Sequence, residues 1–164
     1  MGNDWKLDIG VLVLRLGIGY VFLYAAFKNT ENAEARKAMT DETAVLFRDR
    51  PKEERDWLAL ICFRAGMVMM YGGGVSVLLG LEPRVGGLIL AVFSLLGMRV
   101  HAIRRDEAKE AGEAGNPMGW SAFMAHTAAG LKNWALAAAG VTFILTGAGR
   151  YGLTDYTGAL LGWN

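Results

Sequence analysis

Residues Ile9 to Phe27 form an apolar run of nineteen residues, IGVLVLRLGIGYVFLYAAF, that contains a single charge, Arg15. A run of this length can cross a bilayer as an α-helix. An arginine within such a helix costs roughly 2.5–3.5 kcal/mol on insertion scales unless it is paired or reaches water. The run therefore predicts a transmembrane helix, and Arg15 predicts that something inside the protein compensates a positive charge.

Four apolar segments alternate with charged clusters along the 164 residues, at 9–27, 58–81, 84–103 and 131–148. This segregation is typical of a small polytopic membrane protein, since helices of soluble domains carry a polar face at every turn. Barrel strands would instead alternate apolar and polar residues over about ten positions. We therefore predict an all-α fold, a four-helix transmembrane bundle that forms a single domain over residues 1–164.

The two long connections carry helical patterns of their own. Between 28 and 57, a weak amphipathic stripe predicts a short helix lying at the membrane interface. The stripe consists of Ala35, Ala38, Met39, Glu42, Val45 and Leu46. Residues 104–115 are interpreted as a charged connection, and Asn116 with Pro117 is expected to begin an interfacial lead-in to the fourth span.

The basic residues that flank the spans are distributed unequally. Three of them lie near the termini and the short turn after the second span, whereas twelve lie in or beside the two long connections. Because cytoplasmic loops are enriched in Lys and Arg, this bias predicts cytoplasmic long connections and both termini outside. The formal net charge of +1 excludes the basic surface that nucleic-acid binding needs, so no nucleic acid is expected as a partner.

Small residues recur in the second span. Gly72, Ser76 and Gly80 are spaced four residues apart and predict a ridge on which another helix backbone packs closely. The alternative, that Gly72 to Gly74 cradle a ligand, is the weaker interpretation, since a phosphate-binding loop needs polar surroundings and a preceding strand.

Several cationic and polar side chains approach one membrane face. By connectivity, Arg15 enters from the opposite face, and the four apolar segments contain no Asp or Glu to neutralise any of these charges. Long basic side chains at helix ends can simply reach the interface. The alternative is a ring of cations around an interior cavity that holds an anion or polarises a quinone carbonyl. The residues on this face are Lys28, Arg64, Arg99, His101, Lys132 and Asn133.

The chain has two histidines, His101 and His126, and few roles suit them. Axial haem ligation is disfavoured because the chain has no CxxCH motif, and no Cys/His zinc spacing is present, so neither haem nor metal is predicted. His101 is either an interfacial hydrogen-bonding residue or, as the candidate catalytic residue, a proton acceptor in quinone chemistry.

Short motifs in chain order resemble the DoxX/DoxD family of membrane proteins. The first span LRLGIGYVFLYAAFKN, the third-span ending MRVHAI, the entry KNWALAAAG and the tail GAGRYGLTD carry the resemblance, and the long first connection favours the DoxD branch. The resemblance implies a four-helix membrane protein of a prokaryotic cell membrane. It also implies the large subunit of thiosulfate:quinone oxidoreductase. The matching positions are Arg15, Lys28, His101, Lys132, Asn133, Arg150 and Asp155.

Two functions follow as expectations. The first is a membrane subunit of a quinone-linked oxidoreductase, with quinone as substrate and a second protein subunit as partner, because the small subunit's domain is absent from this chain. The second is a non-catalytic accessory subunit that stabilises a larger respiratory or redox complex in the bilayer. A transporter is a weaker third option, because the chain lacks clear inverted repeats and broken helices.

Overall fold

The computed structural model describes residues 5–153 and shows an all-α protein, as predicted. Among the described residues, four helices are long and apolar enough to cross a membrane: α1 (Trp5–Thr30), α3 (Lys52–Leu79), α4 (Pro83–Glu113) and α5 (Gly119–Thr146). A shorter helix, α2 (Ala33–Thr43), continues into the 3₁₀ turn η1 (Ala44–Phe47), and a second 3₁₀ turn, η2 (Gly149–Tyr151), follows α5. Many large apolar side chains are exposed along the long helices, for example Val68 and Leu145. The chain is therefore a multi-pass integral membrane protein.

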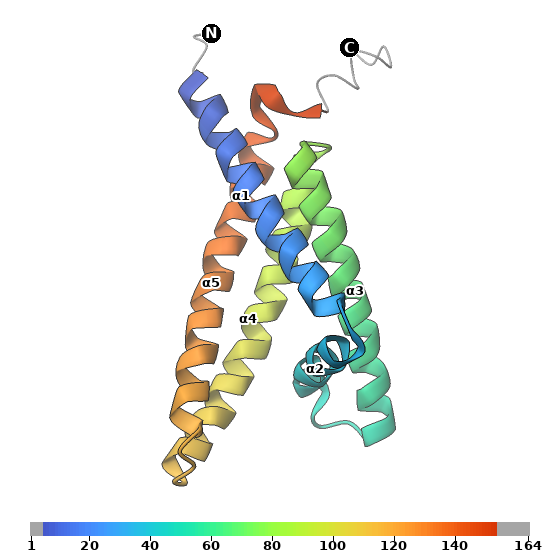
Figure 1. The fold of residues 1–164 in the computed structure, drawn as a ribbon, viewed down its shortest axis with the longest axis vertical. Coiled ribbons are helices and arrows are strands. Elements are labelled where there is room, and N and C mark those ends of the chain that lie inside the picture. Colours follow the sequence, from blue (N-terminus) through green and yellow to red (C-terminus); the bar gives the residue numbers. More distant parts are fainter. Residues whose placement is uncertain (1–4, 154–164) are drawn as a thin grey trace.

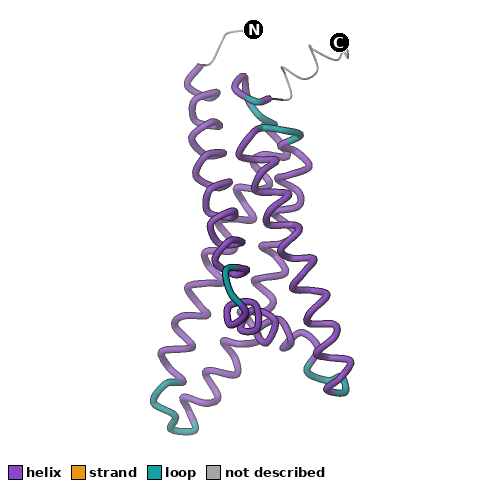
Figure 2. The backbone as a smooth tube through the Cα atoms, turned by 45° about the vertical axis from the view of Figure 1, so that its right-hand side comes forward, coloured by secondary structure: helices purple, strands orange, loops and turns teal. Residues whose placement is uncertain are grey.

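The helices run up and down between two ends of the molecule (Figure 1). The start of α1, the α3–α4 turn and η2 lie at one end, whereas α2, η1 and the α4–α5 turn lie at the other. Toward that second end the α4–α5 hairpin diverges from α3, and α2 lies between the two legs, as Figure 2 also shows. There α2 contacts α1 and α3, and η1 contacts α3 and α4.

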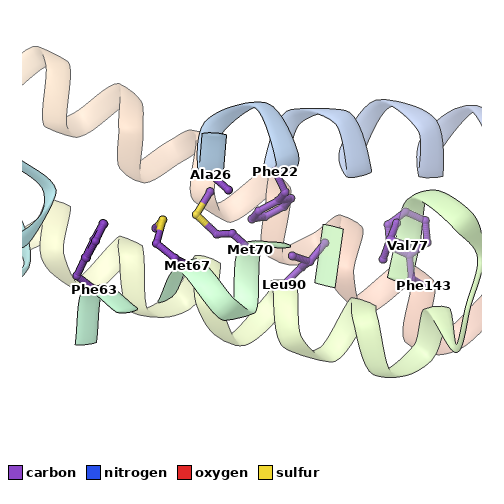
Figure 3. Close-up of a cluster of buried hydrophobic side chains, with 8 residues drawn as sticks. All are labelled: Phe22, Ala26, Phe63, Met67, Met70, Val77, Leu90 and Phe143. Carbon is purple, nitrogen blue, oxygen red and sulfur yellow. The ribbon is translucent and has the colours of Figure 1, made fainter. Parts of the chain in front are cut away.

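The hydrophobic core joins all four long helices. It follows α3, which contributes several of its members, and the row of side chains is visible in Figure 3. Phe22 of α1 packs edge-on against Phe93 of α4, with ring centroids 6.0 Å apart. Met39 of α2 lies partly buried against the same cluster. The buried members are Phe22, Ala26, Phe63, Met67, Met70, Val77, Leu90 and Phe143.

The predicted charged connection after the third span is helical instead. Residues 104–113 extend α4 to Glu113, and α5 runs without a break from Gly119 through the predicted lead-in. Ion pairs within the extension, Arg104–Glu107 at 3.1 Å and Lys109–Glu113 at 3.7 Å, support an exposed polar helix at i,i+3 and i,i+4 spacing. The result is a long antiparallel hairpin that reaches beyond the apolar part of both helices.

Of the predicted ridge, Ser76 makes a close helix contact, since a Cβ on Gly86 of α4 would lie 2.8 Å from the Ser76 Cβ, and other close contacts occur at glycines outside the ridge. Gly72 is exposed, and a Cβ there would meet nothing within 4 Å. Its buried neighbours Gly73 and Gly74 face α4 and α1 instead. Ser76 and Gly80 serve the α3–α4 turn: the Ser76 hydroxyl donates to backbone carbonyls of the turn, and Gly80 ends α3 at φ +68°. This left-handed backbone is one that glycine adopts without a steric penalty.

Candidate functional site

Arg15 is buried in the protein, with 1% of its surface exposed. Its guanidinium donates from Nε to the Val77 carbonyl at 2.9 Å, from Nη2 to the Leu78 carbonyl at 3.2 Å, and from Nη1 to the Ala148 carbonyl at 2.9 Å. Val77 and Leu78 belong to the last turn of α3, which carries the negative end of the helix dipole, and the Val77 carbonyl also accepts a hydrogen bond from the Gly80 N–H at 3.2 Å. Backbone carbonyls therefore compensate the charge of Arg15.

Three of the predicted cations point away from any shared interior. The Lys28 ammonium pairs with the Glu31 carboxylate at 2.8 Å. Arg64 and Arg99 are exposed on α3 and α4, and neither forms a hydrogen bond or ion pair with the part of the chain that the structure describes. Together with the exposed Lys132, these residues gather toward one end of the bundle without converging on one point.

The predicted pair at the start of the fourth span is divided between two environments. Lys132 is exposed on α5, and its charge acts on His101. Asn133 is buried against α4, where a Cβ on Gly97 would come within 2.7 Å of its Nδ2 atom. Asn133 is therefore a packing residue of the α4–α5 hairpin.

The predicted structural tail is only partly described. The backbone N–H of Arg150 donates to Oδ1 of Asp8 at 3.2 Å, which ties η2 to the beginning of α1, while the Arg150 side chain is exposed. Asp155 lies outside the described residues.

A cluster of three titratable side chains joins three separate elements. His101 of α4 and His126 of α5 approach with their Nδ1 atoms 3.3 Å apart, and their ring centroids are separated by 5.6 Å. Oε1 of Glu42, near the end of α2, lies 3.4 Å from the same Nδ1 atom of His101. All three residues are half-buried. The arrangement can carry a proton or bind a cation, because imidazole and carboxylate do both.

A set of polar contacts holds Glu42 in this position. The Arg104 guanidinium of α4 donates to the Asp41 carbonyl at 2.9 Å, next to Glu42, and to the Glu107 carboxylate at 3.1 Å. Glu107 also lies 3.9 Å from the Arg48 guanidinium, which follows η1. These contacts fasten the end of α2 and η1 to the extended part of α4.

The two histidines border an open groove of about 190 Å³ between α4 and α5. Apolar side chains supply much of its surface, and the indole of Trp134 and the guanidinium of Arg105 add polar groups. Its mix of few polar groups among apolar walls resembles the lining of sites for small organic molecules, although its volume is smaller than the roughly 300–1,000 Å³ of such sites. Its lining residues are Met98, His101, Ala102, Arg105, His126, Thr127, Gly130, Leu131 and Trp134.

A second open groove, of about 360 Å³, lies between α2 and α3. Arg36, Lys37 and Arg64 border it, so it is rich in positive charge. Lys37 pairs with Asp41 at 2.6 Å, and this hydrogen bond and attraction raise the pKa of Lys37. The Arg36 guanidinium donates to the Thr30 carbonyl. Of the three cations that line this groove, Arg64 is thus the one that forms no hydrogen bond or ion pair with the described residues.

Sequence reasoning assigned His101 but missed the contributions of His126 and Glu42. The midpoint of 101 and 126 falls between residues 113 and 114, where α4 ends, and residues equally distant from a hairpin turn lie opposite one another. That symmetry was the available signal, but interpreting 104–115 as a loop concealed it. Glu42 gave no comparable signal, because only tertiary packing brings α2 to the hairpin.

Comparison of the chain with models of protein families, with curated proteins and with solved structures finds no match in any of the three.

Proposed function

We propose that the chain is a membrane subunit of a quinone-linked oxidoreductase and that the quinone headgroup binds in the groove between α4 and α5. The observation that carries the proposal is the contact between His101 and His126 at the wall of a largely apolar groove. Quinone reduction needs hydrogen-bond donors for the two carbonyl oxygens and a route for two protons. Imidazole supplies both near neutral pH.

The electron donor in this proposal is a small sulfur oxyanion, with thiosulfate as the candidate that the resemblance to the DoxD branch implies. The groove lined by Arg36 and Arg64 supports the binding of an anion, since guanidinium groups bind oxyanions in a fixed geometry. The sequence carries no haem, flavin or iron–sulfur motif, so the electrons pass through a separate partner subunit in the bilayer. The setting is a prokaryotic cell membrane, with α2 and the α4–α5 turn on the cytoplasmic side.

The test is thiosulfate-dependent reduction of a quinone analogue by membranes that contain the chain and its partner. We expect His126→Gln and His101→Gln each to lower kcat/KM for quinone by about a hundredfold or more, the scale of one general acid or base. Trp134→Ala is expected to raise the KM for quinone with less effect on kcat, because it removes groove wall.

The matched control is Glu110→Gln, which neutralises an exposed carboxylate on α4 outside the groove. Its activity should equal that of the native protein. Unchanged quinone kinetics in both histidine variants would contradict the proposed site.

The second candidate function is a non-catalytic subunit that stabilises a larger redox complex. Arg15, one of the positions that match the DoxX/DoxD resemblance, favours this second function. Its three hydrogen bonds all go to backbone carbonyls of the chain itself. This function predicts that the chain purifies in mild detergent as a stoichiometric member of a complex. It also predicts that turnover of that complex is insensitive to His101→Gln and His126→Gln, which separates it from the first candidate.

A further inference from the structure

We infer that Glu42, His101 and His126 form a binding site for a divalent transition-metal ion, with Zn²⁺ as the best-fitting ion. The inference is independent of the quinone proposal, because it concerns what these three side chains bind in the absence of any quinone or electron donor. The ligand atoms that the three residues offer all lie within 4.8 Å of one another. They come from α2, α4 and α5, so a bound ion would join three elements.

The distances at His101 match those between ligands of a tetrahedral ion. Its Nδ1 atom lies 3.3 Å from Nδ1 of His126 and 3.4 Å from Oε1 of Glu42. Zinc binds imidazole nitrogen and carboxylate oxygen at about 2.0–2.2 Å, and a tetrahedron with such bonds has edges of about 3.3–3.6 Å. Two of the three edges therefore already have the length that a zinc ion requires.

Hydrogen bonding alone accounts for this cluster only weakly. Nδ1 of an imidazole carries one proton or one lone pair, yet Nδ1 of His101 faces both a second imidazole nitrogen and a carboxylate oxygen. A single N–H on His101 can serve both neighbours only as a shared three-centre hydrogen bond, with Glu42 and His126 both accepting at long range. A metal ion replaces the single proton with a centre that accepts lone pairs from all three residues at once.

The surroundings of the cluster fit an accessible but ordered site. The contact of Arg104 with the Asp41 carbonyl holds Glu42 next to the hairpin, so the ligands are positioned before an ion arrives. The Glu42 carboxylate brings negative charge that offsets the positive charge of Lys132, which also acts on His101. Both histidines border the open groove between α4 and α5, which supplies an entry path. Three protein ligands leave a fourth position for water or another small ligand.

The chain's composition makes the test specific, because these are its two histidines and its single cysteine, Cys62, is outside the cluster. The full chain is purified without a histidine tag, stripped with chelator, placed in lipid nanodiscs and titrated with Co²⁺. Visible absorption then reports tetrahedral coordination. We expect one Co²⁺ per chain, an intense tetrahedral spectrum, and displacement of the ion by Zn²⁺.

Variants assign the ligands. His101→Gln and His126→Gln should each weaken Co²⁺ and Zn²⁺ binding by at least about a hundredfold, and Glu42→Gln by at least about tenfold. Glu110→Gln is the matched control and should bind as the native chain does. Thermal unfolding gives a second readout, because Zn²⁺ should raise the melting temperature of the native chain and of Glu110→Gln but not that of His126→Gln.

Absence of saturable binding to the native chain would overturn the inference. The same holds if His126→Gln binds Zn²⁺ as tightly as the native chain, since the ion would then be held elsewhere. The quinone assay is not involved in either result, so a failure of the metal site is distinguishable from a failure of the proposed function.

Discussion

A single buried arginine shows how a costly residue in a membrane helix becomes part of the fold. Arg15 of α1 is nearly inaccessible, and its three donating nitrogens reach carbonyls of Val77, Leu78 and Ala148. These carbonyls lie where α3 ends and where the chain leaves α5, positions where helical N–H partners become scarce, although the Gly80 N–H also donates to Val77. The guanidinium and the carbonyls therefore satisfy one another. Gly80 completes the arrangement, because a Cβ at that position would collide with the guanidinium of Arg15.

We predict that Arg15→Leu destabilises the protein, because it removes the side-chain donor of the Leu78 carbonyl and the charge-assisted hydrogen bonds to Val77 and Ala148. Each buried polar group left unsatisfied costs roughly 1–3 kcal/mol. Arg15→Lys should recover only part of the stability, since one ammonium cannot reproduce the planar geometry of the three contacts. The measurement is the midpoint of thermal or denaturant unfolding in detergent micelles.

Arg99→Leu is the matched control, because it removes an exposed arginine with no partner among the described residues. Its change in stability should stay within about 0.5 kcal/mol, as for most surface substitutions. If Arg15→Leu were as stable as Arg99→Leu, the capping role of Arg15 would be excluded.

At the scale of elements, the α4–α5 hairpin is the most closely packed pair and determines where the histidines meet. Gly87 of α4 and Gly140 of α5 face each other, and a Cβ on either would lie 2.6 Å from the other's carbonyl oxygen. Small residues let membrane helices approach in this way. Farther along the same hairpin, the contact between Gly97 and Asn133 and then that between His101 and His126 maintain the register.

We predict that Gly140→Ala lowers stability by about 1–3 kcal/mol, because the new methyl group meets backbone that cannot give way without separating the helices. Gly130→Ala on the same helix is the control: its Cβ would meet nothing within 4 Å, and alanine is the better helix former by up to about 1 kcal/mol. Unfolding midpoints of the two variants should therefore shift in opposite directions. Equal shifts would contradict the packing contact.

At the scale of the whole molecule, the two ends differ in charge and in structure. The end with the α3–α4 turn is short and has few basic residues, whereas the other end holds α2, η1 and the extended hairpin (Figure 1). Both candidate grooves lie toward this second end, on either side of the last turn of α2, where Asp41 borders one groove and Glu42 contacts His101 of the other.

We predict that the end containing α2 is cytoplasmic, because it has most of the Lys and Arg residues that flank the spans. Single cysteines replace the exposed residues Lys6 and Glu34 in a Cys62→Ser background, and intact cells are treated with a membrane-impermeant maleimide. Lys6→Cys should react and Glu34→Cys should react only after permeabilisation. The reverse pattern would invert the orientation, and reaction of both in intact cells would contradict their placement at opposite ends.

Local sequence patterns determined the fold class and the membrane spans. Hydropathy and length are sufficient for this, because a membrane helix satisfies its own backbone hydrogen bonds and needs no partner to be recognised. The short helix between the first and second spans was predicted for the same reason, since its stripe is local. The extension of α4 was missed, because Arg104, Glu107, Lys109 and Glu113 are polar enough to resemble a loop unless their i,i+3 and i,i+4 pairing is weighed.

The chemistry of the candidate site was decided by tertiary structure alone. The sequence identified Arg15 and His101 as unusual, but the partners of Arg15 are carbonyls on two other elements, which no side-chain pattern records. Likewise, Glu42, His101 and His126 are distant in sequence and meet only because α2 lies beside the α4–α5 hairpin. Which helices cross the membrane depends on each segment's own free energy of transfer, whereas which side chains meet depends on packing between segments.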